Sequence, residues 1–302
     1  MFLSRLVLPV SLGLVLAAGS ARAEVREMTL TATAVSWEIA PGQSVSAWAY
    51  NGSVPGPEIH AKAGDTIRVT LVNRLPEPTT IHWHGVPVPN GMDGVPGITA
   101  PVVPPGGSFV YEFPAPAPGT YWYHPHHDTA AQVGRGLYGL LVVDPPEKRW
   151  DREVPLVIGE FGGMAGAMTG TRGMGATRGS GGGMGSGMMV GTLLINGKTA
   201  PAIPALRVKR GERVLFRMLN TGNMVHPMHV HGMRWEIVAT DGFALSQSYA
   251  KDTLPLNAGE RYDGLLVADN PGRWLVHCHN LDHVGESGTT MTGLVFELVV
   301  EE

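Results

Sequence analysis

The 302-residue sequence predicts an all-β protein built from two Greek-key β-sandwich domains. It contains 41 glycines and 24 prolines, a content typical of short strands joined by tight turns. Its apolar segments are short, and none keeps a helical period long enough for a major helix. The two halves of the sequence also resemble each other, which indicates a duplicated domain.

Seven runs rich in β-branched and aromatic residues are the clearest strand candidates. Glycine, proline or asparagine bounds these runs, so we expect turns at their ends. The runs lie at residues 66–72, 108–113, 137–143, 213–219, 235–239, 264–268 and 294–300.

The duplication is visible in two pairs of segments. Residues 63–73 resemble residues 209–220, and residues 118–124 resemble residues 271–277. We therefore expect a first domain at residues 24–147 and a second at residues 148–302. The second domain would carry a Gly/Met-rich insertion at about residues 161–191, which cannot form a packed core.

The first 23 residues have the pattern of a secretory signal. A basic start at Met1–Arg5 precedes an apolar run at Leu6–Ala18, and Ala21–Ala23 has the form of a cleavage site. The run is too short to span a membrane, so we expect cleavage, no membrane span and a periplasmic or secreted protein. An uncleaved anchor is the alternative. The formal net charge of -4 gives no reason to expect a nucleic-acid partner.

Histidine carries the most specific signal in the sequence. Twelve histidines placed at random in 302 residues would give fewer than one His-x-His pair, yet four occur. Residues i and i+2 of a strand point to the same face, so each pair presents two imidazoles side by side. Eight imidazoles without a carboxylate or thiolate among them favour copper over zinc. The pairs are His82/His84, His124/His126, His229/His231 and His277/His279.

The single cysteine, Cys278, lies between His277 and His279. Alternation places its sulfur on the opposite face of the strand, so one strand can serve two metal sites. His226 and His283 are available as further ligands beside Cys278. Two histidines, a thiolate and a weak axial group describe a blue-copper electron-transfer centre.

These residues resemble the four copper motifs of the multicopper oxidases, the laccase-like blue oxidases built from cupredoxin domains. The resemblance covers nearly the whole chain after the expected signal. It implies a type 1 copper at His226, Cys278 and His283, and a type 2 copper at His82 and His229. It also implies a type 3 copper pair, held by His84, His124, His126, His231, His277 and His279. The motifs are His82-Trp-His-Gly85, His124-Pro-His126, His226-Pro-Met-His-Val-His-Gly232 and His277-Cys-His-Asn-Leu-Asp-His283.

The chain departs from the family in its length and in the loop after His283. Most members have three domains, whereas this chain has room for two. The family's axial residue lies ten positions after the cysteine, where this chain has Gly288. Met291-Thr-Gly-Leu294 resembles the axial methionine and the strand after it, displaced by three residues. We therefore expect Met291 to be the axial ligand, with a core-filling role as the alternative.

Three further polar residues need an interpretation. Asp93, in Gly91-Met-Asp-Gly-Val95, resembles the family's acid that delivers protons to the trinuclear site, although a turn aspartate before glycine also serves local structure. His60 and His127 are the two histidines outside the expected ligand set. We expect ordinary surface or packing roles for both, with a role behind the metal ligands as the alternative for His127.

The resemblance implies an oxidoreductase. A small reducing substrate (a phenol, an aromatic amine or Cu(I)) would give electrons to the type 1 copper, and dioxygen would be reduced to water at the other three. The Met-rich stretch resembles those of cuprous oxidases, and thioethers favour Cu(I), although a plain linker would look the same. A copper-sequestration protein is one alternative. A copper nitrite reductase is another, but that family carries its type 1 cysteine in the first domain.

The two-domain relatives also imply an assembly. The trinuclear ligands come from both halves, and no middle domain is present to bring them together within one chain. The resemblance therefore implies a homotrimer with a trinuclear site between neighbouring subunits. A monomer folded back on itself is the alternative.

Overall fold

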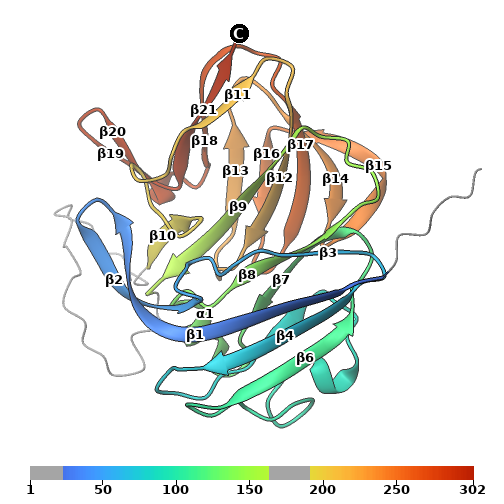
Figure 1. Cartoon of the computed structure of the whole chain (residues 1–302). Coiled ribbons are helices and arrows are strands. Elements are labelled where there is room, and N and C mark those ends of the chain that lie inside the picture. Colours follow the sequence, from blue (N-terminus) through green and yellow to red (C-terminus); the bar gives the residue numbers. More distant parts are fainter. Residues whose placement is uncertain (1–22, 163–190) are drawn as a thin grey trace, which may run out of the picture.

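The computed structural model describes residues 23–162 and 191–302, and strands dominate both segments (Figure 1). The predicted all-β class with two sandwiches is confirmed. All seven predicted strand runs coincide with strands, apart from shifts of a few residues at their ends. The expected signal sequence, except its last residue, and nearly all of the Gly/Met-rich insertion lie outside the described residues.

The first sandwich consists of two four-stranded sheets, in the orders β2-β1-β4-β6 and β3-β8-β7-β5. Helix α1 (Thr129–Val133) and the 3-10 turn η1 (Asn90–Met92) lie in its loops. Alternating side chains of both sheets, including Trp83 and Tyr111, fill the space between them. The strands are β1 (Val25–Ala40), β2 (Gln43–Tyr50), β3 (Ile59–Lys62), β4 (Thr66–Asn73), β5 (His82–His84), β6 (Ser108–Pro114), β7 (Gly119–His124) and β8 (Gly139–Asp144).

The second sandwich packs a six-stranded sheet, β10-β9-β12-β17-β14-β15, against a five-stranded sheet, β11-β21-β18-β13-β16. A separate hairpin, β19–β20, projects from it (Figure 1), and the 3-10 turn η2 (Leu281–His283) precedes this hairpin. The strands are β9 (Arg152–Phe161), β10 (Thr192–Ile195), β11 (Leu206–Lys209), β12 (Arg213–Asn220), β13 (His226–Val230), β14 (Trp235–Thr240), β15 (Phe243–Lys251), β16 (Thr253–Leu256), β17 (Arg261–Val267), β18 (Gly272–Cys278), β19 (Val284–Ser287), β20 (Thr290–Gly293) and β21 (Val295–Glu301).

Strand pairing repeats from one sandwich to the other. The parallel pair β1–β4 corresponds to β9–β12, and the parallel pair β3–β8 corresponds to β11–β21. The antiparallel pairs β5–β7 and β13–β18, which carry the histidine motifs, correspond as well. Asn73 pairs with Ala32 in the first sandwich, as Asn220 pairs with Ile158 in the second. The duplication seen in the sequence therefore extends to the register of the strands.

An apolar cluster joins the two sandwiches. Side chains of β2, β7 and β8 pack against Val157 of β9 and Leu219 of β12. The contact is also close at the backbone, because a Cβ added to Gly119 would lie 2.3 Å from the carbonyl oxygen of Gly242. The sandwiches are thus held in one arrangement by packing that leaves no room for a side chain at this point.

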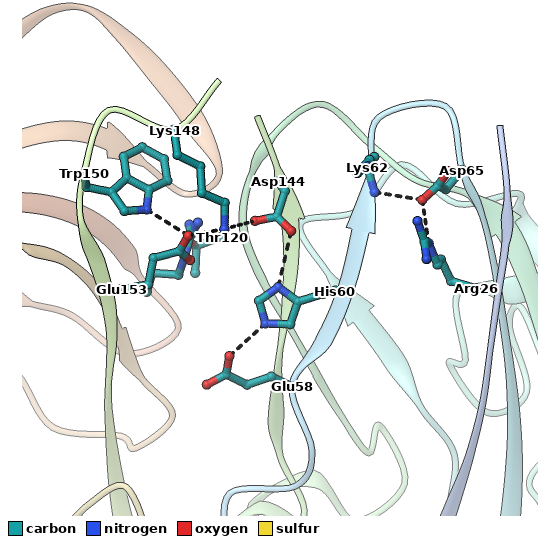
Figure 2. Close-up of polar contacts among 11 residues, drawn as sticks. Arg26, Glu58, His60, Lys62, Asp65, Thr120, Asp144, Lys148, Trp150 and Glu153 are labelled. Atoms are coloured by element: carbon teal, nitrogen blue, oxygen red, sulfur yellow. Dashed lines mark hydrogen bonds and ion pairs between the residues drawn. The ribbon is translucent and has the colours of Figure 1, made fainter. Parts of the chain in front are cut away.

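A buried polar group completes this interface. Arg217 of β12 donates from Nε to Glu153 Oε2 at 2.8 Å and from Nη1 to Thr120 Oγ1 of the first sandwich at 2.7 Å. Its Nη1 is also 3.3 Å from Asp263 Oδ2. Burial opposes ionisation of Glu153, but hydrogen bonds from Lys148, Arg217 and a tryptophan outweigh it and lower its pKa to about 2. Figure 2 shows Lys148 between Glu153 and Asp144 at the edge of this group.

The described helical segments, α1 and the two 3-10 turns, have neither the length nor the apolar character that crossing a membrane requires.

Arg217→Met is expected to destabilise the protein by about 3–5 kcal/mol, because it removes the cation that contacts the buried Asp263 carboxylate and leaves the partly buried Glu153 with Lys148 as its remaining cation. Chemical denaturation of the copper-free protein measures this loss. Arg273→Met is the matched control: Arg273 is 79% exposed in its ion pair with Glu297, so the change should be below about 1 kcal/mol. Equal effects of the two substitutions would contradict a structural role for the buried group.

Candidate functional site

Four histidines of the first sandwich converge beside β5 and β7. His82 and His84 lie on one face of β5, and His82 is directly opposite His124 at the end of β7. The ring centroid of His82 is 5.3 Å from that of His124 and 5.5 Å from that of His126. Ligand atoms of His82, His84 and His124 all lie within 4.8 Å of one another. We call these four residues the first histidine set.

The second sandwich repeats this arrangement. His229 of β13 is directly opposite His277 of β18. The ring centroid of His229 is 5.0 Å from that of His231, 5.6 Å from that of His277 and 5.7 Å from that of His279. These four residues form the second histidine set, and its members correspond one to one with those of the first.

Hydrogen bonds fix the orientation of the two residues expected at the type 2 copper. His82 Nδ1 is 2.9 Å from the carbonyl oxygen of Asp93, and His229 Nδ1 is 2.9 Å from that of Asp252. A carbonyl only accepts, so each Nδ1 carries the proton. The lone pair is then on Nε2 in both residues, which suits metal binding through that atom.

Four of the other six imidazoles face one another in two pairs. His124 Nδ1 donates to the Pro125 carbonyl at 2.9 Å, while its Nε2 lies 3.4 Å from His84 Nδ1. His277 Nδ1 donates to the Cys278 carbonyl at 2.9 Å, and its Nε2 lies 3.0 Å from His231 Nε2. Each pair therefore turns two ring nitrogens toward the same small region, as a shared metal requires.

The surroundings favour the neutral form of two members of the first set. Burial lowers the pKa of His124 to about 3, and burial together with the Arg261 guanidinium lowers the pKa of His84 to about 4. The Trp122 ring stacks on His84, with centroids 4.8 Å apart, and lies tilted against His124, with centroids 4.1 Å apart. Since metals bind the neutral imidazole, these rings are ready to ligate at neutral pH.

The two histidine sets do not touch. Throughout the described chain, ring contacts between these eight histidines occur only among members of the same set. His84 instead packs against the turn before β17, where a Cβ on Gly259 would be 3.3 Å from its Cε1. His126 and His279 are exposed. One chain thus presents two separate, half-open sets of four imidazoles.

A second kind of site lies on the opposite face of β18. Cys278, His226 and His283 are buried, and their ligand atoms lie within 4.8 Å of one another. Cys278 Sγ is 3.5 Å from His283 Nδ1 and 3.9 Å from His226 Nδ1. The two Nδ1 atoms are 3.1 Å apart. Burial raises the pKa of the thiol to about 11, so a bound metal would have to displace its proton.

The donor chemistry of both places fits copper. Neutral imidazoles with no carboxylate among them, and a buried thiolate with two imidazole nitrogens, are ligand sets that copper accepts. The sequence predicted that Cys278 would face away from its histidine neighbours, and the structure has this arrangement. The buried Met228, directly opposite Cys278 on β13, adds an apolar wall to the cysteine side of the strand.

Met291 lies on the projecting hairpin, partly buried and paired with Glu286. It shares its face of the hairpin with Val284, which packs against the core cluster that contains Cys278. A Cβ on Gly293 at the base would lie 2.2 Å from the His283 carbonyl oxygen, so the hairpin starts directly beside the cysteine site. Met291 therefore shares a face of this hairpin with a residue that packs on the core, and its axial role stays a prediction.

Asp93 follows η1 and contacts the first histidine set. Its Oδ1 is 3.2 Å from His82 Nδ1, in addition to the hydrogen bond from that nitrogen to its own carbonyl. The next residue, Gly94, has φ +79°, and a Cβ there would lie 1.8 Å from the Ile81 carbonyl oxygen. Only glycine allows this approach, which holds Asp93 beside His82.

The two histidines outside the expected ligand set lie apart from these sites. His60 of β3 is exposed, with Nε2 3.0 Å from Glu58 Oε2 and Nδ1 3.5 Å from Asp144 Oδ2 (Figure 2). The hydrogen bond to Glu58, together with the charge of Asp144, raises its pKa. His127 lies partly exposed in the loop between β7 and α1.

Sequence reasoning missed two charged residues that act on the expected ligands. Arg261 reaches from β17 toward His84 and is fixed by the carbonyls of Gly259 and Asp241, both at 2.9 Å. Glu160, at the end of β9, has its Oε1 3.1 Å from His226 Nε2. Burial opposes ionisation of Glu160, but hydrogen bonds from His226 and the Met224 N–H outweigh it and lower its pKa. No local motif marks either residue. Only an alignment of the two halves could have drawn attention to Glu160.

Comparisons with known proteins agree with this chemistry. Two family profiles described as multicopper oxidase match residues 31–148 and 179–297. The chain is 33% identical to Multicopper oxidase MmcO of Mycobacterium tuberculosis, over 75% of this chain and 49% of that protein. It is 28% identical to a Copper resistance protein A homolog of Pseudomonas syringae pv. tomato, over 83% and 49%. The chain thus spans about half the length of the curated relatives it matches.

Solved structures of copper oxidases also resemble this chain, and the resemblance covers more of their own length than it does for the curated relatives. The Blue Copper Oxidase from Nitrosomonas europaea superposes with a TM-score of 0.81 at 31% identity, covering 91% of this chain and 86% of that one. The multicopper oxidase mgLAC also has a TM-score of 0.81, at 35% identity, covering 92% and 86%.

Cys278→Ser is expected to abolish the intense visible absorption of the copper-loaded protein, because that absorption requires a copper–thiolate bond. The histidine sets should keep their copper, since the Cys278 side chain points away from His277 and His279. Absorption and EPR spectroscopy with copper analysis measure both effects, and far-UV circular dichroism controls for the fold. A blue Cys278→Ser protein would contradict the assignment.

Proposed function

Since the chain belongs to the multicopper oxidase family, we propose that it is a laccase-like, copper-dependent oxidoreductase. It couples one-electron oxidation of a small substrate to the reduction of dioxygen to water. The observation that carries this proposal is the position of Cys278. Its backbone runs directly into His277 and His279, so a covalent path joins a buried thiolate site to the second histidine set.

We assign the copper ligands by motif and contact. His226, Cys278 and His283, with Met291 as axial group, would hold the type 1 copper, and His82 and His229 the type 2 copper. Bound copper supplies one-electron redox chemistry and the binding of dioxygen. The type 3 pair would be held by His84, His124, His126, His231, His277 and His279.

Asp93 is proposed to deliver protons. Reducing dioxygen to two waters consumes four protons, and a carboxyl group next to the site can supply them from solvent. The support for this role is the 3.2 Å contact with His82 and the partial exposure of the carboxylate. A purely local turn role would require neither.

The reducing substrate is proposed to approach the cysteine site. Val225, which precedes His226, is 45% exposed, and Leu281 of η2, near His283, is 69% exposed. These apolar side chains suit a phenol or an aromatic amine. Cu(I) is the other proposed substrate, on the grounds of the methionine content of residues 161–191, most of which lie outside the described residues.

We also propose the domain division 24–147 and 148–302, and export to the periplasm or beyond, with removal of residues 1–23. The support for export is the basic and apolar pattern of the first residues and a chemistry that uses dioxygen and copper.

The enzymatic proposal is tested by oxygen uptake. Copper-loaded protein should consume one dioxygen for each four electrons taken from a phenol or from Cu(I), and copper removal should abolish uptake. Asp93→Asn should slow turnover roughly 100-fold while substrate still bleaches the blue colour at the normal rate. Tight copper binding without oxygen uptake would instead indicate a sequestration protein. Nitrite reduction without oxygen uptake would indicate a nitrite reductase, which is disfavoured because the cysteine lies in the second half.

The assembly is proposed to be a homotrimer. A cluster that needs ligands from both histidine sets must bring them together, and within one chain they face different surroundings. Docking the first sandwich of one subunit on the second sandwich of the next would join them. Such a head-to-tail contact avoids a filament only if it closes into a ring, and the two-domain relatives close it with three subunits.

Mixing two inactive variants distinguishes the ring from a folded-back monomer. His82→Ala damages the first set and His229→Ala the second, so each protein alone should be inactive. Unfolded and refolded together in equal amounts, they should regain about a quarter of wild-type activity, because about a quarter of the interfaces then combine two intact sets. Sedimentation should give three chains per particle. An active monomer, or mixtures without recovery, would contradict the trimer.

A further inference from the structure

We infer that Glu160 is a positioning residue for the type 1 copper, which fixes the orientation of His226 and lowers the reduction potential of the site. This inference rests on the proposed function. The carboxylate lies outside every ligand motif, and no step described above uses it.

The first observation is the two-sided environment of His226. The imidazole is fully buried, with Nδ1 3.1 Å from His283 Nδ1 and 3.9 Å from Cys278 Sγ. Its other nitrogen, Nε2, lies 3.1 Å from Glu160 Oε1. The carboxylate accepts a hydrogen bond from the Nε2–H group. The proton is therefore on Nε2, and the lone pair is on Nδ1, the nitrogen that faces the cysteine.

The second observation is that Glu160 is itself held in place. Its side chain is 10% exposed, and Oε1 also accepts the Met224 N–H at 2.8 Å. The loop before β13 wraps closely around it, since a Cβ on Gly222 would lie 2.2 Å from Oε1. A carboxylate fixed by the backbone can in turn fix the ring that donates to it.

The third observation comes from the duplication. The register of β1 with β4 and of β9 with β12 makes Ala34 the equivalent of Glu160. Counting on from the equivalent Asn73 and Asn220, Thr79 is the equivalent of His226. The first sandwich has no cysteine and folds with alanine at this position. The carboxylate is therefore not required by the fold, and it occurs in the sandwich that carries the cysteine site.

The fourth observation is an asymmetry of charge. His283 Nε2 lies 3.0 Å from the side-chain amide of Asn280, a neutral partner, whereas His226 has a carboxylate. A hydrogen-bonded carboxylate makes an imidazole a stronger donor, and a stronger donor stabilises Cu(II) relative to Cu(I). Removing the charge while keeping the hydrogen bond should therefore raise the potential.

The test compares Glu160→Gln, Glu160→Ala and Glu160→Asp in the copper-loaded protein. Glu160→Gln should remain blue, while the ratio of reduced to oxidised type 1 copper in a fixed redox buffer rises on the order of tenfold, about 59 mV. Glu160→Ala should also loosen the site, with about 10- to 100-fold weaker type 1 copper binding and an altered EPR hyperfine splitting. Glu160→Asp should restore part of the wild-type potential.

Asp282→Asn is the matched control, because it removes an exposed carboxylate beside His283 that makes no hydrogen bond to either ligand. Its potential should change much less than that of Glu160→Gln. Thermal unfolding of the copper-free variants reports any structural damage separately. If the wild type is blue, and neither Glu160→Gln nor Glu160→Ala changes its potential or its EPR spectrum, the inference is wrong while the proposed function stands. A wild type without a blue centre would overturn it together with the proposed function.

Discussion

The alternation of side chains along a strand is the constraint on which both candidate sites depend. On β18, His277 points to one face and Cys278 to the other, and His279 follows directly after the strand end. Pairing with β13 then brings His229 opposite His277 and buries His226 on the side of the cysteine. A shift of one residue in this register would exchange the two faces and dismantle both sites together. The paired strands are therefore as much a part of the chemistry as the ligands are.

The contact between the sandwiches has a different consequence. The buried Arg217 group and the apolar cluster around Val157 and Leu219 hold the two halves together, and Arg261 and Gly259 lie against His84 in that arrangement. The same packing that stabilises the chain thus keeps the first histidine set away from the second. In the proposed trimer this interface would stay closed, whereas bringing the sets together within one chain would require it to open.

The sequence was sufficient for the fold class, the duplication and the grouping of the histidines, because these follow from local periodicity and from histidine spacing. Asp93 was found through its motif, although its contact with His82 depends on the glycine turn at Gly94. Glu160 and Arg261 could not be found in this way. Each lies far along the chain from the histidine it acts on, and only the packing of β9 and β17 brings the two together. Met291 is an intermediate case. Its residue type suggested an axial role, but it lies on a hairpin and is displaced from the family's usual position after the cysteine.

The duplicated fold also separates what a cupredoxin-like sandwich needs from what its metal site needs. Thr79 and Ala34 stand in the first sandwich where His226 and Glu160 stand in the second, and both sandwiches keep the same strand register. Thr79 donates to Gln132 Oε1 at 2.7 Å, so this position is satisfied by an ordinary buried hydrogen bond when no cysteine site is present. The framework therefore tolerates either solution, and the function resides in a few side chains placed on it. On this argument, the histidine sets common to both halves need the shared strand geometry, while the cysteine site needs residues that one half alone carries.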